Sequence, residues 1–396
     1  MSGLFSALEA PSPDPIIKLM GVFAADPRAD KVDLGVGVYR DAAGRTPVMA
    51  AVAAAEARIL AQQESKGYLG LAGDPAFIAA MQGLLIGDAA PAERVAAVAT
   101  PGGSGALRQL LELVRRAAPE ATVWVSDPSW PNHAAITREV GLRLAHHRWL
   151  DPASGQVDLD AVLADLQAAR PGDVLILHAS CHNPTGGDLS AEGWAALADL
   201  AERQGVVPLV DVAYQGFGAG VAEDAAGLRL LAGRLPELLV AASGSKSFGL
   251  YRERVGLSLA LCDGAGSARR VTAALTSLNR KNYAFPPDHG ARVVTTILSD
   301  PVLDADWRAE LDAMRHRLTD TRTALTAALR DATGSGRFDF LTTQRGMFSL
   351  LGLTPAQVEA LRTDHAVYLI GDSRANLAGL TPETTPRVAR AIAAVL

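Results

Sequence analysis

The amino-acid sequence predicts an α/β protein whose central sheet is mainly parallel. Between residues 122 and 243, short apolar runs such as 173–178 (DVLILH) alternate with segments of helical length. Continuous apolar runs of this kind are typical of parallel strands that helices bury on both faces. After residue 304 the alternation gives way to one long, charged helical pattern. We therefore expect a second, smaller domain there, to which the N-terminal segment returns.

Hydrophobic periodicity and turn residues define the expected elements in order. A strand-like run at 31–38 (KVDLGVGV) ends in glycines, and a glycine-rich turn opens the helix at 106–117. Further strands are expected at 122–126, 142–146, 173–178, 207–211 and 238–243. Helices are expected at 50–63, 75–87, 106–117, 132–140, 158–170, 190–204 and about 305–331. A Gly/Ser break at 334–336, two short strands and a terminal helix complete the pattern.

Composition excludes several classes of protein. Apolar residues make up 49% of the 396 residues and charged residues 20%, which indicates a globular chain. The net charge is -6 and Lys and Arg do not cluster, so neither a nucleic-acid nor an anionic membrane surface is expected. Residues 1–20 lack the basic and apolar regions of a signal peptide, and no apolar run reaches the ~18 residues of a membrane span. The 2 cysteines, Cys181 and Cys262, favour a reduced, cytoplasmic setting over a disulfide framework.

Polar residues follow the expected strands at the edge of the sheet where ligands bind in parallel α/β folds. Asp211 ends one strand and Tyr214 follows it; Lys246 lies after the next strand in 243–249 (SGSKSFG), with Arg254 beyond. This order suits pyridoxal phosphate, because a lysine can bind its aldehyde, a carboxylate its pyridinium nitrogen, and hydroxyls with an arginine its phosphate. Taken singly, Asp211 and Tyr214 are better explained as a helix cap and a core side chain. Lys246 alone is explained equally well as a surface residue.

Other loops contain groups that would complete such a site. Glycines at 100–108 (TPGGSGALR) open a helix, whose free N–H groups favour a phosphate, although an ordinary glycine-rich turn explains them equally well. The segment lacks the Gly-Lys-Ser/Thr of a nucleotide P-loop. Asn183 lies in a Pro/Gly turn from which its amide could reach a ring oxygen, and Trp130 could cover a flat ring or simply fill a loop. His178 and His182 have no third ligand at a sensible spacing, so no metal site is expected.

Taken together, segments spread over nearly the whole chain resemble the class I, fold-type I pyridoxal phosphate-dependent aminotransferases, in particular their aspartate and aromatic amino acid branch. The matching segments are 34–41 (LGVGVYRD), 68–70 (YLG), 101–108, 123–133 (VWVSDPSWPNH), 181–186 (CHNPTG), 211–218 (DVAYQGFG), 243–256, 283–290, 346–349 (GMFS) and 371–382. The resemblance implies a mainly parallel, seven-stranded sheet sandwiched by helices, plus a smaller α+β domain. It implies an N-terminal arm at 1–13, a small domain from 14–45 with 305–396, and a large cofactor-binding domain at 46–304.

The resemblance also implies a role for each matching position. Lys246, Asp211 and Tyr214 would be catalytic: the lysine binds the cofactor and carries protons, the carboxylate keeps the ring nitrogen protonated, and the phenol bonds the ring oxygen. The implied cofactor-binding residues are Gly103, Ser104, Trp130, His133, Asn183, Asp211, Tyr214, Ser243, Ser245, Lys246 and Arg254. Tyr68 would reach the phosphate from a neighbouring subunit, so the resemblance implies a homodimer.

The implied substrates are amino acids and 2-oxo acids. Arg374 would bind the substrate α-carboxylate in a bidentate fork, and Arg280 of the second subunit would pair with the distal carboxylate of acidic substrates. The remaining implied substrate contacts are Gly37, Trp130, Asn183, Phe285 and Phe348. Sequence spacing alone would have left both arginines as surface residues.

Two departures from the aspartate-selective pattern concern specificity. Such members generally carry Asn where this chain has Gly67 and Phe285. A less polar pocket suits an aromatic side chain, whereas Arg280 still favours an acidic one. We therefore expect a dual-specificity enzyme for Phe, Tyr or Trp and acidic amino acids, with 2-oxoglutarate or glutamate as partner. The alternatives are an aspartate aminotransferase with little aromatic activity and, in a different class, a cofactor-containing regulatory protein that has lost turnover.

Overall fold

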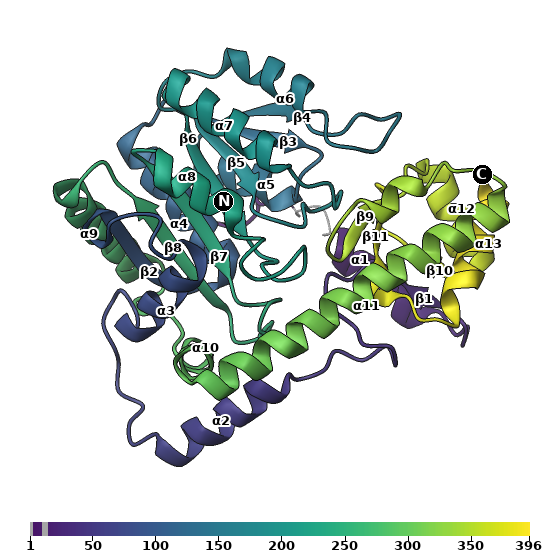
Figure 1. Ribbon diagram of the computed structural model, residues 1–396, viewed down its shortest axis with the longest axis horizontal. Coiled ribbons are helices and arrows are strands. Elements are labelled where there is room, and N and C mark those ends of the chain that lie inside the picture. The colour runs from purple at the N-terminus through teal and green to yellow at the C-terminus, as the bar shows by residue number, and fades with distance from the viewer. Residues whose placement is uncertain (1–2, 10–14) are drawn as a thin grey trace.

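The computed structural model describes residues 3–9 and 15–396 and contains two lobes (Figure 1). The expected arm at 1–13 therefore falls partly outside the described residues, and its described part, 3–9, is exposed. The larger lobe is built on a sheet, and the long helix α11 (Pro301–Thr333) runs from beside it into the smaller lobe. No helix within the described ranges is both long and apolar enough to cross a membrane.

The large lobe contains a 7-stranded sheet, as the fold class predicts. The strands, in spatial order, are β2 (Val95–Pro101), β8 (Val255–Leu261), β7 (Leu238–Ser243), β6 (Val207–Val212), β5 (Val174–His178), β3 (Thr122–Asp127) and β4 (Arg143–Arg148). Strand β8 is antiparallel to both of its neighbours, and the remaining pairs are parallel. The sheet is thus mainly parallel, and its fold class is confirmed.

Helices cover both faces of this sheet (Figure 1). In β5, Leu175 and Leu177 belong to one buried cluster while Val174 and Ile176 belong to another, because successive strand residues point to opposite faces. The helices of this lobe are α2 (Ala50–Gln62), α3 (Pro75–Leu85), α4 (Gly102–Ala117), α5 (Pro131–Glu139), α6 (Leu159–Asp165), α7 (Ala191–Gln204), α8 (Ala226–Arg234), α9 (Ala265–Asn282) and α10 (His289–Ser299). One buried core layer therefore packs against each face of the sheet.

The small lobe has its own buried cluster, which joins residues near 32–34 with residues from 325 to 392. Strand β1 (Val32–Asp33) pairs in parallel with β10 (Val367–Tyr368), and β9 (Phe348–Leu350) pairs antiparallel with β11 (Arg374–Asn376). Its further helices are α1 (Pro15–Ala25), α12 (Pro355–His365) and α13 (Thr384–Val395), and short 3-10 turns lie at Asp339–Thr342 and Leu377–Gly379. We propose on this basis that 14–45 and 305–396 form one domain and 46–304 the other.

Several local predictions are wrong in extent. The strand expected at 31–38 is only Val32–Asp33, because the chain then turns: the Asp33 carboxylate accepts from Gly35 N at 2.9 Å, and Asn376 donates to the Val36 and Val38 carbonyls at 2.6 and 2.8 Å. The pattern also missed β2, β8, α1, α8, α9, α10 and α12, and the C-terminal part contains three short strands where two were expected. The long helix was expected, and it ends at Gly334, which takes the left-handed φ of 65° that favours glycine at this position.

Candidate active site

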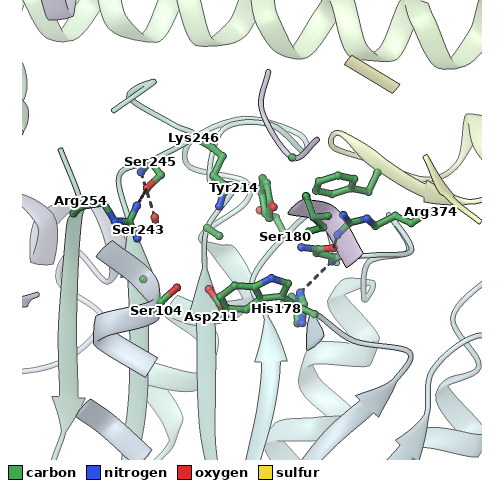
Figure 2. Close-up of a pocket in the computed structure, with 17 residues that line it drawn as sticks. Ser104, His178, Ser180, Asp211, Tyr214, Ser243, Ser245, Lys246, Arg254 and Arg374 are labelled. Atoms are coloured by element: carbon green, nitrogen blue, oxygen red, sulfur yellow. Dashed lines mark hydrogen bonds between the residues drawn. The ribbon is translucent and has the colours of Figure 1, made fainter. Parts of the chain in front are cut away.

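A cavity of about 210 Å³ opens at the carboxyl ends of the parallel strands, between the two lobes (Figure 2). The predicted residues that line it are Gly37, Gly103, Ser104, Trp130, Asn183, Asp211, Tyr214, Ser243, Ser245, Lys246, Arg254, Phe348 and Arg374. Figure 2 shows Arg254 and Arg374 at opposite ends of the cavity, with Lys246 and Tyr214 between them. The fold therefore brings together residues that lie more than half the chain apart.

Lys246 follows β7 in a turn and points into the middle of the cavity (Figure 2). Burial lowers the pKa of its amine and the nearby Arg254 lowers it further, while Asp211 acts in the opposite direction. Its Nζ lies 5.0 Å from the centre of the Tyr214 ring. Burial also raises the pKa of the Tyr214 phenol. An amine that gives up its proton more readily than usual suits a nucleophile and a proton carrier.

Asp211 lies near the end of β6, where His133 fixes its carboxylate. The His133 ring lies 2.9 Å from Asp211 through Nε2 and 2.9 Å from the Ser129 hydroxyl through Nδ1. Burial alone would raise the pKa of Asp211, but the hydrogen bond from His133 and the nearby Lys246 outweigh it, so the pKa is lowered. Asp211 is thus held as an anion that faces the cavity.

The end of the cavity near Arg254 suits an anion. Arg254 donates from Nη1 to the Ser245 hydroxyl at 3.4 Å and to the Tyr251 carbonyl at 3.1 Å, and Ser245 N donates to Ser243 Oγ at 3.2 Å. Helix α4 begins here at Gly102, and the first N–H groups of a helix have no acceptor within it. A Cβ on Gly102 would lie 2.6 Å from Arg254 Nη2, so the backbone must come this close to the guanidinium. Hydroxyls, a guanidinium and a helix N-terminus are the donors that a phosphate dianion requires.

The opposite end is formed around Arg374, at the start of β11. Its side chain is buried; Nη1 donates to the Asn183 amide oxygen at 3.4 Å and Nη2 to the Gly35 carbonyl at 3.4 Å. Its Cζ lies 4.8 Å from the centre of the Phe348 ring. Phe348 in turn meets Tyr214 edge to face at 6.1 Å. A buried guanidinium beside an aromatic wall suits a small carboxylate with an apolar or planar remainder.

Four predicted site residues do not line this cavity: His133, which contacts the Asp211 carboxylate, and Tyr68, Arg280 and Phe285. Tyr68 is 86% exposed and stacks on Phe285 with ring centres 4.6 Å apart, in a separate groove that also contains Gly67. Arg280, in the last turn of α9, is exposed. Within one chain, Tyr68, Arg280 and Phe285 therefore do not reach Lys246.

Sequence reasoning considered His178 only as a metal ligand, yet it lines the cavity. Its Nδ1 accepts from Asn183 N at 3.1 Å, and its Nε2 lies 3.4 Å from the Ser129 hydroxyl. Burial lowers its pKa to about 3, so the ring is neutral at physiological pH. No group of three metal-ligating side chains occurs within 3–9 and 15–396. The strand-end rule that selected Asp211 would have selected His178 as well, because it is the last residue of β5.

Comparisons with known proteins agree with this geometry. The family model of class I and II aminotransferases matches residues 29–392. The chain is 51% identical over 385 residues to an aromatic-amino-acid aminotransferase of Paracoccus denitrificans, covering 97% of this chain and 98% of the relative. It is 42% identical over 396 residues to an aspartate aminotransferase of Salmonella typhi, covering 99% and 100%. A solved aromatic-amino-acid aminotransferase from Burkholderia pseudomallei, covalently bound to pyridoxal phosphate, superposes with a TM-score of 0.97 at 41% identity over 100% of both chains.

Proposed function

The chain belongs to the class I and II aminotransferases, and we propose that it transfers amino groups from both aromatic and acidic amino acids, with 2-oxoglutarate or glutamate as partner. Its cofactor is pyridoxal phosphate, which a solved relative of the same fold binds covalently. The residues of the cavity fit this group: a primary amine for its aldehyde, a held carboxylate for its ring nitrogen, and hydroxyls with Arg254 for its phosphate. When bound, this cofactor supplies a protonated ring that withdraws the electrons left on the substrate α-carbon when its proton is removed.

The residues of this chain perform the remaining tasks. Lys246 Nζ, with its lowered pKa, takes the proton from the α-carbon of the amino acid in the first half-reaction. In the second half-reaction it delivers a proton to the corresponding carbon of the 2-oxo acid. Asp211 stays anionic because His133 donates to it, so it holds a proton on the ring nitrogen opposite. Tyr214 and Asn183, which line the cavity, would donate to the ring oxygen, and Trp130 would cover one face of the ring. The turn at Ser243–Lys246 and the start of α4 fix the phosphate, so that the reacting carbon stays in reach of Lys246.

Substrate binding is assigned to the other end of the cavity. Arg374 binds the α-carboxylate in a bidentate manner, with Asn183 orienting the guanidinium and the backbone at Gly37 beside it. A Cβ at Gly37 would lie 3.3 Å from the Phe348 ring, which shows how closely this backbone approaches the substrate wall. Because every α-amino acid carries this carboxylate, Arg374 serves aromatic and acidic substrates alike.

The distal side of the substrate site requires a second copy of the chain. Exposed Tyr68 stacks on the partly buried Phe285, and Arg280 is exposed at the end of α9. Leu4, Phe5 and Leu8 of the described arm are 87%, 73% and 74% exposed, which supports burial against another molecule. In the proposed homodimer, Tyr68 and Arg280 of one subunit complete the site of the other. Arg280 then faces the distal carboxylate of an acidic substrate.

The observation that supports aromatic substrates is the Tyr68–Phe285 stack in the groove that contains Gly67. A pocket wall of this composition is less polar than one lined by asparagine amides, and the 51% identical relative carries an aromatic name. The aspartate aminotransferase alternative is supported by Arg280 and by the 42% identical relative.

The test is a panel of amino donors with 2-oxoglutarate as acceptor, compared by kcat/KM. Comparable values for phenylalanine, tyrosine and aspartate are expected. Negligible turnover of phenylalanine with rapid turnover of aspartate would show that the protein is an aspartate aminotransferase with little aromatic activity. A protein that holds the cofactor but turns over neither donor would be the non-catalytic regulatory protein.

A further inference from the structure

Arg322, on α11, is a buried arginine that has no part in the roles above. It is 3% exposed, and every nitrogen of its guanidinium donates a hydrogen bond. The acceptors are the carbonyls of Leu341 at 3.3 Å, Arg345 at 3.1 Å, Gly346 at 2.9 Å and Phe348 at 2.7 Å, and the Ser349 hydroxyl at 2.7 Å. All of them lie between residues 341 and 349. One side chain thus ties the end of the 3-10 turn, the irregular stretch 343–347 and the start of β9 to α11.

The segment that Arg322 holds carries part of the substrate wall. Phe348 begins β9, and β9 pairs antiparallel with β11, where Asn376 stands opposite Phe348 and Arg374 opposite Leu350. The Phe348 ring lies 4.8 Å from Arg374 Cζ. A displacement of β9 would therefore move both Phe348 and the strand that presents Arg374.

The segment 341–349 also packs closely against the turn at Gly186 in the large lobe. Arg345 N donates to the Gly186 carbonyl at 2.8 Å. A Cβ on Gly186, where φ is +72°, would lie 2.5 Å from the Phe348 carbonyl and 3.1 Å from Arg322 Nη2. Gly186 closes the turn that presents Asn183, whose amide oxygen accepts from Arg374. Arg322 thus lies where the loops on the two sides of Arg374 meet.

We propose that Arg322 is a positioning residue for recognition of the substrate α-carboxylate. Arg322 holds 341–349 in a single conformation. This conformation positions Phe348 and β11 on one side of Arg374 and the 183–186 turn on the other. The inference rests on the proposed role of Arg374. Because none of the hydrogen bonds of Arg322 reaches Lys246, Asp211 or the phosphate end, which lie in and after β6 and β7 and at the start of α4, Arg322 acts on substrate binding rather than on the cofactor or the chemical step.

The test compares Arg322→Met, which keeps the length of the side chain without its donors, with Arg322→Lys, which keeps the charge and some donors. Arg330→Met is the matched control, because Arg330 lies on the same helix, is exposed and pairs with Asp339 at the surface. The readouts are kcat and KM for phenylalanine and aspartate, and the dissociation constants of 3-phenylpropionate and succinate from the holoenzyme. These two carboxylates lack an amino group and report binding without reaction.

A misplacement of about 1 Å can cost on the order of 100-fold, so we expect Arg322→Met to weaken both carboxylates and to raise both KM values by about tenfold or more. Arg322→Lys should show a smaller increase in the same direction, and kcat and the cofactor absorbance should stay near those of the Arg330→Met control. If Arg322→Met does not fold, the dissociation constants and KM values of Arg322→Lys test the inference. Dissociation constants equal to the control, or a loss in kcat or cofactor binding alone, would overturn the inference. If Arg374→Ala also leaves both dissociation constants unchanged, the proposed role of Arg374 has failed instead.

Discussion

The two ends of the active-site cavity are built in different ways. The end around Lys246 consists of residues at or just beyond the carboxyl ends of strands of a single sheet, such as Asp211 in β6 and Ser243 in β7. The end around Arg374 is assembled from Gly35, Asn183 and Phe348, which come from distant parts of the chain and from both lobes. The first kind of position depends on one rigid element, whereas the second depends on how two lobes pack. We expect substitutions at the first end to change the rate for every substrate, and substitutions at the second to change affinity and choice.

The largest effect is expected at the cofactor end, for Lys246→Ala. Loss of the primary amine should lower kcat for every donor by several orders of magnitude, because Lys246 has no second lysine beside it among the described residues that line the cavity. The yellow, pH-dependent absorbance of the purified enzyme should disappear with it. Normal turnover by Lys246→Ala would contradict the assignment of this cavity as the active site.

A smaller loss is expected for Asp211→Asn, at the same end. The amide keeps the shape of the side chain but not the charge, and loss of a preorganised electrostatic partner costs about 10²-fold or more in kcat. The matched control is Asp173→Asn, because Asp173 is also buried but lies at the other end of β5, where it accepts from Trp124 Nε1 at 3.2 Å. Asp173→Asn should lower stability and leave kcat alone. Equal kcat values for Asp211→Asn and wild type would place Asp211 outside the chemistry.

At the substrate end, Arg374→Ala and Arg280→Ala should differ in which substrates they affect. Removal of one buried partner of a charged pair costs on the order of 2–5 kcal/mol for ligands that use it. Arg374→Ala should impose this loss in kcat/KM on phenylalanine and aspartate alike. Arg280→Ala should impose it on aspartate and glutamate only. An equal loss for phenylalanine and aspartate in Arg280→Ala would contradict the division of roles.

The smallest effect is expected for the wall that selects the substrate side chain. In wild type, Phe285 stacks on Tyr68, and Gly67 N donates to Ser65 Oγ at 3.0 Å. Phe285→Asn combined with Gly67→Asn makes this wall more polar, so preference should move toward aspartate by roughly 1–3 kcal/mol. The measurement is the ratio of kcat/KM for phenylalanine to that for aspartate. A ratio that stays constant would show that these two positions do not set specificity.

The same contrast explains what the sequence could predict. Lys246 and Asp211 follow from the rule that ligands bind beyond the carboxyl ends of parallel strands, so local patterns were enough to pair them. Arg374 has no local signal, because its neighbours are supplied by the packing of the two lobes; only the resemblance identified it. His178 satisfied the strand-end rule but was considered only for a metal. Arg322 had no signal at all, since its acceptors are backbone carbonyls and one serine hydroxyl.

The missed strands have a physical explanation as well. Strand β2 (VAAVATP) is rich in alanine and contains no aromatic residue, so its periodicity is weak. Strand β8 (VGLSLAL) is interrupted by Gly256 and Ser258. A Cβ on Gly256 would lie 2.3 Å from the backbone of Gly102, so the glycine that weakens the strand pattern is required for the close approach of the phosphate-binding turn.

Because β2 pairs with the later strand β8, β2 cannot join the sheet until β8 has been synthesised. Strand β2 lies at the edge of the sheet and pairs with β8, with Pro101 opposite Val255 and Val95 opposite Leu261. At synthesis rates of about 5–20 residues per second, β2 is made roughly 8–30 s before its partner. The Gly102 turn directly after β2 cannot take its final place until then. The nascent chain therefore becomes able to hold its phosphate group only when about two thirds of it has been translated, and the apolar β2 must be kept from other partners in the meantime.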